Sequence, residues 1–174
     1  MQDHRQRFEA LALPHMDAAY NLARWLSRSP ADADDIVQDA MLRAFRAFEQ
    51  FHGENIRPWL LTIVRNCWRN RAVDTRRRGH TPLFAEDDNS LAFGGPDPET
   101  EALHASESRR LQAMIAGLPE DFRTVLILRE MEDLSYREIA EMTGAPIGTV
   151  MSRLARARAL LKDNWLAEGA HVVR

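Results

Sequence analysis

The sequence predicts an all-α protein made of two small helical bundles joined by a flexible acidic linker, with a helix-turn-helix in the second bundle. Apolar residues recur at spacings of three and four through most of the 174 residues, which is the period of an amphipathic helix. Residues 79–103 break that pattern with a pair of glycines, three prolines and an acidic run. We place the first bundle at residues 1–79, the linker at 80–104 and the second bundle at 105–174.

Composition and charge are those of an ordinary soluble protein. Hydrophobic residues make up 45% of the chain and charged residues 28%, with a formal net charge of −3. Residues 1–79 hold 13 basic and 10 acidic side chains, residues 80–109 hold 1 and 7, and residues 110–174 hold 9 and 9. The single cysteine, Cys67, excludes an intramolecular disulfide. Without a signal-peptide core or the ~18 apolar residues of a membrane span, we expect a cytoplasmic protein with no membrane insertion.

Two helices are expected at the start of the first bundle. Residues 4–28 carry apolar side chains at helical spacing, and Pro14 is expected to break or restart that helix. Ser29 and Pro30 form a start signal for the next helix, with serine as the cap and proline in the first turn. This helix is expected to end at the loop formed by residues 52–56.

The third helix, expected over residues 57–77 with Asn55 as a candidate cap, is strongly basic. From Arg57 to Arg78 the chain carries seven arginines and one acid. Arginines with interleaved aromatic residues suit single-stranded DNA, because phosphates are neutralised and unstacked bases lie on the rings. The alternative is that Trp59 and Trp68 are core residues, which we favour for Trp59 and leave open for Trp68.

The second bundle is expected to begin with one helix over residues 104–117 and another starting at Pro119. Ser135 and Glu138 then have the spacing of a capping box, so a further helix is expected to start at Ser135. Gly144 stands where a helix needs a left-handed residue to stop.

The last helix, expected to begin at Pro146, has one apolar stripe that reaches Leu161 and one basic face that carries hydroxyl groups. No acid lies between Pro146 and Lys162. Two short helices joined by a glycine-containing turn, the second one basic, indicate a helix-turn-helix whose second helix enters the major groove. The alternative is an ordinary helical hairpin with a solvated arginine face.

The stretch LPEDFRTVLILREMEDLSYREIAEMTG, followed by PIGTVMSRLARAR, resembles the C-terminal domain of bacterial sigma factors of the extracytoplasmic-function group in the sigma-70 family. The resemblance implies that the last helix reads the upstream promoter element as double-stranded DNA. Ser152 and Arg156 are the expected base readers, and Arg153 is expected to contact a phosphate or an internal acid. The full predicted set is Thr149, Met151, Ser152, Arg153, Ala155, Arg156 and Arg158.

The stretches DADDIVQDAMLRAFRAF and RPWLLTIVRNCWRNRAVDTRRR resemble the promoter-melting domain of the same group. The resemblance implies that the basic third helix holds the melted strand, with a base pocket at Asn66 and with the loop at residues 52–56 setting specificity. The predicted contacts to single-stranded DNA are Asn55, Arg65, Asn66, Trp68, Arg69, Arg76 and Arg77.

An acidic run opens the second helix. Its plain interpretation is negative charge at the positive end of the helix dipole. The resemblance implies a further role: Asp35, Gln38 and Asp39 are predicted to bind the coiled coil of the largest subunit of core RNA polymerase. The flap of the polymerase is expected as a second contact.

The sequence gives little support to an enzyme. The six histidines show no metal-ligand spacing, and the chain has no Walker loop or GxGxxG motif, so we expect no metal and no cofactor. By resemblance, the chain directs promoter-specific transcription initiation and is controlled by an anti-sigma factor. Two other classes stay open: a stand-alone helix-turn-helix transcription regulator, and a sigma mimic that sequesters an anti-sigma protein.

Overall fold

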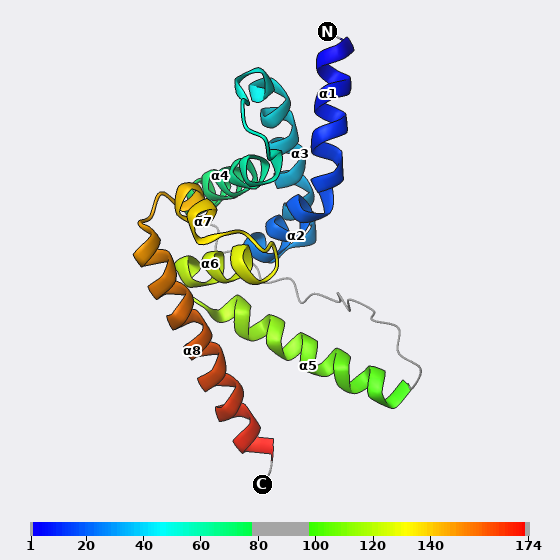
Figure 1. Ribbon diagram of the computed structural model, residues 1–174. Coiled ribbons are helices and arrows are strands. Elements are labelled where there is room, and N and C mark those ends of the chain that lie inside the picture. The colour runs from blue at the N-terminus through cyan, green and yellow to red at the C-terminus, as the bar shows by residue number, and fades with distance from the viewer. Residues whose placement is uncertain (1, 78–97, 173–174) are drawn as a thin grey trace.

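The computed structural model describes residues 2–77 and 98–172, and every regular element in these two ranges is helical (Figure 1). The predicted all-α class is confirmed. The first bundle contains α1 (Gln2–Ala12), a 3-10 turn (Leu13–His15), α2 (Met16–Ser27), α3 (Pro30–Ala47), a second 3-10 turn (Phe48–Gln50) and α4 (Ile56–Arg77). The second bundle contains α5 (Pro98–Gly117), α6 (Glu120–Glu130), α7 (Tyr136–Thr143) and α8 (Ile147–Val172). None of the described helices is long and apolar enough to cross a membrane.

The predicted start and break signals of the first bundle are confirmed. Pro14 lies in the 3-10 turn that separates α1 from α2. The Ser29 hydroxyl accepts a hydrogen bond from the Asp32 N–H at 3.3 Å and so caps α3. The Asn55 side chain accepts from the Arg57 N–H at 3.1 Å at the start of α4. Each of these contacts satisfies a backbone donor that a helix start leaves without an intrahelical partner.

One predicted boundary of the second bundle was wrong. The helix expected to resume near His104 begins at Pro98, and proline suits the first turn of a helix. The last helix extends to Val172, beyond the apolar stripe that the sequence predicts as far as Leu161. The remainder of the predicted linker, residues 80–97, lies outside the described residues.

The hydrophobic core is shared between the bundles. One cluster of buried side chains includes Leu22 and Leu61 of the first bundle together with Leu128, Ile139 and Leu154 of the second. A smaller cluster lies within the first bundle and consists of Phe8, Ala12, Ala44, Phe48, Ile56 and Leu60. In Figure 1, α6 and α7 lie against α2 and α4, and the first half of α8 packs against α6 and α7 before its C-terminal half extends away with α5. The second bundle therefore packs against the helix predicted to hold the melted strand.

Candidate nucleic-acid interface

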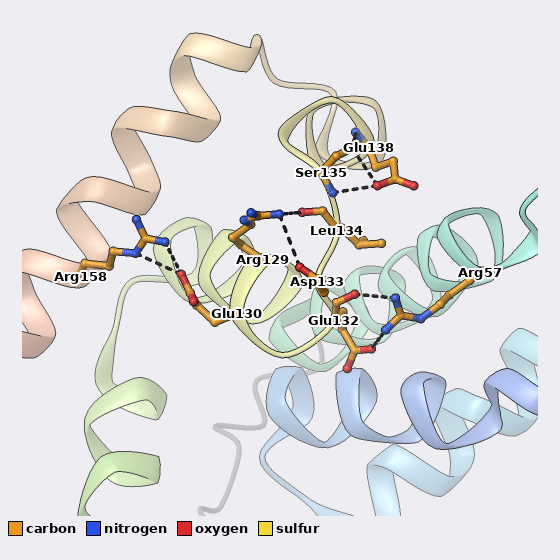
Figure 2. A network of polar contacts seen from close by, with 9 residues as sticks. All are labelled: Arg57, Arg129, Glu130, Glu132, Asp133, Leu134, Ser135, Glu138 and Arg158. Carbon is orange, nitrogen blue, oxygen red and sulfur yellow. Dashed lines mark hydrogen bonds and ion pairs between the residues drawn. The ribbon is translucent and has the colours of Figure 1, made fainter.

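The turn between α7 and α8 has the geometry of a helix-turn-helix. The Ser135 hydroxyl accepts from the Glu138 N–H at 3.2 Å, and the Glu138 carboxylate accepts from the Ser135 N–H at 2.8 Å, which confirms the capping box (Figure 2). Gly144 ends α7 with φ +66°, the left-handed conformation that glycine adopts readily. These local contacts fix where α8 begins and hence which of its residues point outward.

The predicted reading face of α8 is exposed. Val150, Leu154 and Ala157 are buried in the shared core, which leaves the opposite side of the helix in solvent. Met151 is 50% exposed, and the exposed residues on the same side are Ser152, Ala155 and Arg156. Thr149 is half-buried. The face that the sequence predicts to enter the major groove is therefore open to a ligand in this structure.

Two other arginines of α8 bind carboxylates within the second bundle. Arg153 pairs with Asp121 of α6 at 2.6 Å, which agrees with the internal acid that the sequence left as one of its two alternatives. Arg158 pairs with Glu130 at the end of α6 (Figure 2). Both pairs join α6 to α8 at the surface, so DNA would have to displace a carboxylate to bind either guanidinium group.

The predicted melting helix α4 presents only part of its basic face. Asn66 and Arg69 are exposed, as the sequence predicts for residues that contact a strand. In contrast, Arg65 is 8% exposed and Trp68 is 7% exposed, and Trp68 packs in the shared core. The structure thus favours the core alternative for Trp68. Of the other predicted contacts, Asn55 and Arg77 are exposed, while the Arg76 side chain lies outside the described part of the chain.

The burial of Arg65 is electrostatically unfavourable. Its guanidinium donates to the Met142 carbonyl of α7 at 3.1 Å, and its Nε atom has no hydrogen-bond partner among the described residues. Burial lowers the pKa of Arg65, and Arg69 lowers it further, while the nearby acids Glu120 and Asp121 act in the opposite direction. A cation in this position has exchanged most of its water for one strong acceptor.

The predicted polymerase-binding residues lie on the outer face of α3. Asp35 accepts from Arg71 of α4 at 2.9 Å, and Asp39 pairs with Arg43 one turn further along at 3.4 Å. Gln38 is exposed between them. These ion pairs are at the surface and contribute little to stability, so a partner with a basic surface could exchange them at low cost.

Three arginines of the first bundle donate to main-chain carbonyls in the second, and we refer to them as the arginine clasp. The three contacts are Arg28 to Ala116 near the end of α5, Arg57 to Glu132 just after α6, and Arg65 to Met142 near the end of α7. Helix C-termini leave carbonyl groups without intrahelical partners and carry partial negative charge. The guanidinium groups therefore stabilise these carbonyls, and the Ala116 carbonyl also accepts from Arg123 of the second bundle at 2.9 Å.

Arg57 makes the most extensive contact of the clasp (Figure 2). It donates to the Glu132 carbonyl at 2.5 Å and to the Glu132 carboxylate at 2.7 Å. The Glu132 side chain is 4% exposed. Burial raises the pKa of the Glu132 carboxyl, and the charge of Arg57 opposes that shift. No sequence pattern predicts this pair, because its two residues lie 75 positions apart and neither belongs to a short motif.

The family comparisons match the two bundles separately. Residues 11–78 match sigma-70 region 2, and residues 108–161 match sigma-70 region 4. The chain is 37% identical over 149 residues to the ECF RNA polymerase sigma-E factor of Haemophilus influenzae, covering 82% of this chain and 78% of that protein. It is 34% identical over 158 residues to the ECF RNA polymerase sigma factor SigE of Mycolicibacterium smegmatis, covering 90% of this chain and 60% of that protein.

The chain belongs to the extracytoplasmic-function group of sigma-70 factors. Members of this family are transcription initiation factors rather than enzymes. Its fold is similar to the sigma factor RpoE of Bartonella quintana, solved with the anti-sigma factor NepR, with a TM-score of 0.73, 26% identity and coverage of 94% of this chain and 96% of that one. It is also similar to CnrH, solved with the cytosolic domain of CnrY, with a TM-score of 0.67, 25% identity and coverage of 94% and 90%.

Proposed function

We propose that this sigma factor acts in the cytoplasm, where it binds core RNA polymerase and directs it to promoters through two DNA contacts. In this proposal residues 1–79 bind the polymerase and hold the melted strand, residues 105–174 read the upstream element, and residues 80–104 link them. The observation that carries the proposal is the presence of both sigma-70 regions in one chain, together with an exposed reading face on α8.

The exposed side chains of α8 support different roles in binding the upstream element. Arg156 is exposed and has no ion-pair partner among the described residues, so it suits the commonest major-groove contact, arginine to guanine. Ser152 lies on the same face and supplies a hydroxyl group. Met151 and Ala155 add apolar contact there. With few polar readers, the upstream element would also be recognised partly by its shape.

On α4, Asn66 is the proposed base-binding residue, and Arg69 and Arg77 are proposed to bind phosphates. On α3, Asp35, Gln38 and Asp39 form the proposed contact with the coiled coil of the largest polymerase subunit. An acidic face of this kind would speed and orient docking on a basic partner more than it would tighten it.

We also propose that an anti-sigma factor controls this chain. Support comes from the similar structure of RpoE, a sigma factor bound to the anti-sigma factor NepR, and from CnrH, which was solved with the cytosolic domain of CnrY. The flap of the polymerase is a further proposed partner, and it would contact the second bundle.

Run-off transcription tests the proposal. Core polymerase from the same organism is mixed with a pool of its upstream DNA regions, with and without this protein. Defined transcripts that appear only when the protein is added are the expected result. Absence of binding to core polymerase would overturn the proposal in favour of a stand-alone regulator or a sigma mimic.

A further inference from the structure

We propose that three residues of α8 form an apolar ridge that recognises the 5-methyl group of thymine in the upstream promoter element. The three are Ile147, Met151 and Ala155, and we refer to them as the apolar ridge. The proposal deepens the proposed function and rests on it, because it names the base chemistry that the reading face selects. It adds Ile147 to the residues predicted to read DNA.

The exposure of Ile147 is not explained by the packing of α8. Its spacing of three and seven residues from Val150 and Leu154 places it on the apolar stripe, and both of those residues are buried. Ile147 is instead 47% exposed at the first position of α8, directly after the turn that follows α7. A single exposed apolar residue is common on protein surfaces. This one points to a ligand because it lies beside the other exposed apolar residues of the reading face.

The apolar ridge is continuous along the start of α8. Met151 is 50% exposed and Ala155 is exposed, and each lies four residues after the previous member. Residues four apart are neighbours on a helix surface, with Cβ atoms about 5–6 Å apart. From the first member to the last the helix rises about 12 Å, because each residue adds about 1.5 Å. That length matches roughly three to four base steps of DNA, at about 3.4 Å each along a strand.

The surroundings of the apolar ridge favour DNA over an apolar protein partner. Because a helix turn holds about 3.6 residues, Ser152 lies next to the ridge and Arg156 lies beyond it on the same exposed side. No acid occurs between Pro146 and Lys162. The ridge is thus bordered by a hydroxyl group and a cation on the second helix of a helix-turn-helix, which is the setting of a major-groove reader. The phosphates of DNA complement this charge.

Thymine is the base that matches an apolar ridge. In the major groove it alone among the four bases carries a methyl group, and apolar side chains contact that methyl. Ile147 and Ala155 have no side-chain group that forms hydrogen bonds, and the Met151 sulfur is only a weak acceptor. These residues therefore cannot select guanine, cytosine or adenine by hydrogen bonds. Burial of one methyl group corresponds to about a fourfold gain in affinity.

Deoxyuridine provides the test, because it differs from thymidine only by the absence of the 5-methyl group. Run-off transcription with core polymerase first yields the promoters. The upstream element of the strongest promoter is then synthesised with each thymine replaced in turn by deoxyuridine, and competition binding measures the affinity of the assembled holoenzyme for each duplex. At one or more positions the replacement should weaken binding about fourfold. No effect at any thymine would overturn the proposal, as would an upstream element without thymine.

A protein variant links the lost methyl group to the apolar ridge. Ile147→Ala combined with Met151→Ala shortens both large side chains, so its holoenzyme should bind thymine and deoxyuridine duplexes equally at the positions that matter for the wild-type protein. Leu166→Ala is the matched control, because Leu166 is a 59% exposed residue of the same helix that lies beyond the predicted reading residues. The control should keep the wild-type sensitivity. Equal sensitivity in the ridge variant and the wild-type protein would contradict recognition by these side chains.

5-Methylcytosine gives a second measurement that needs no variant. At a sensitive position the thymine–adenine pair is replaced by cytosine–guanine, with or without a 5-methyl group on the cytosine. The methylated duplex should bind about fourfold tighter, because the two duplexes differ only by that methyl group. Equal binding would overturn methyl recognition and reassign the deoxyuridine effect to DNA shape. Failure of the proposed function has a different signature, in which no promoter-specific transcripts appear and the holoenzyme shows no preference among upstream duplexes.

Discussion

The two faces proposed to bind DNA differ in how much of each the fold leaves open. The reading helix α8 buries one stripe, formed by Val150, Leu154 and Ala157, and keeps its opposite side in solvent. The melting helix α4 packs on two sides: its apolar stripe faces its own bundle, and Arg65 on a neighbouring face is covered by α7. A basic helix face in the sequence is therefore not sufficient for DNA binding, because packing of the second bundle covers part of such a face on α4 and leaves the one on α8 exposed.

The largest expected effect comes from the side of α8 that faces away from DNA. Leu154 is 1% exposed in the shared core, so Leu154→Ala should lower the free energy of unfolding by about 2–5 kcal/mol. Leu166→Ala is the matched control, because that leucine of the same helix is 59% exposed and its loss should change the value by less than about 0.5 kcal/mol. Denaturant unfolding measures both. Similar losses for the two variants would show that α8 is not anchored by its buried stripe.

Asn66→Ala probes the exposed part of the melting helix. Loss of the base contact should weaken strand opening by about 1–3 kcal/mol. Because Asn66 is exposed, the free energy of unfolding should stay within about 0.5 kcal/mol of the wild-type value. Permanganate footprinting of the promoter measures opening, and co-purification with core polymerase is the control. Lost polymerase binding would show that Asn66 has a structural role.

These two helices also show what a sequence can and cannot predict. Caps at Ser29 and Ser135 and the stop at Gly144 were predicted correctly, because each depends on contacts within a few residues. The apolar stripe of α8 was predicted for the same reason: helical periodicity is a local property. The start of α5 at Pro98 was missed, since the glycines and prolines of the neighbouring segment outweighed a local start signal.

The covering of α4 could not be predicted from periodicity. Arg65 stands off the apolar line, so the pattern places it on an outer face, and only the packing of a distant bundle buries it. The same holds for the pair between Arg57 and Glu132. Buried ion pairs across bundles depend on tertiary geometry, for which a single sequence carries no spacing signal.

Arg156→Ala tests the proposed base contact on the exposed face of α8. It should weaken promoter binding by about 1–3 kcal/mol at one upstream base position and relax specificity there. Arg153→Ala is the contrasting variant, because Arg153 is already paired with Asp121. Its effect on promoter binding should be similar at every upstream sequence. Binding of a library of upstream elements measures both, and a uniform loss for Arg156→Ala would reassign that residue to the phosphate backbone.

The smallest expected effect separates a serine that builds the helix-turn-helix from one that is proposed to read DNA. Ser135→Ala removes the cap of α7 and should lower the free energy of unfolding by about 0.5–2 kcal/mol. Ser152 is exposed, and its hydroxyl donates to the Thr149 carbonyl of its own helix at 3.0 Å, so Ser152→Ala should change that free energy by less than about 0.5 kcal/mol. Upstream DNA binding should respond in the opposite order once both proteins are folded, because only Ser152 lies on the reading face. A stability loss at Ser152 equal to that at Ser135 would mean that the exposed face of α8 contributes to folding and that Ser152 is not solely a DNA-binding residue.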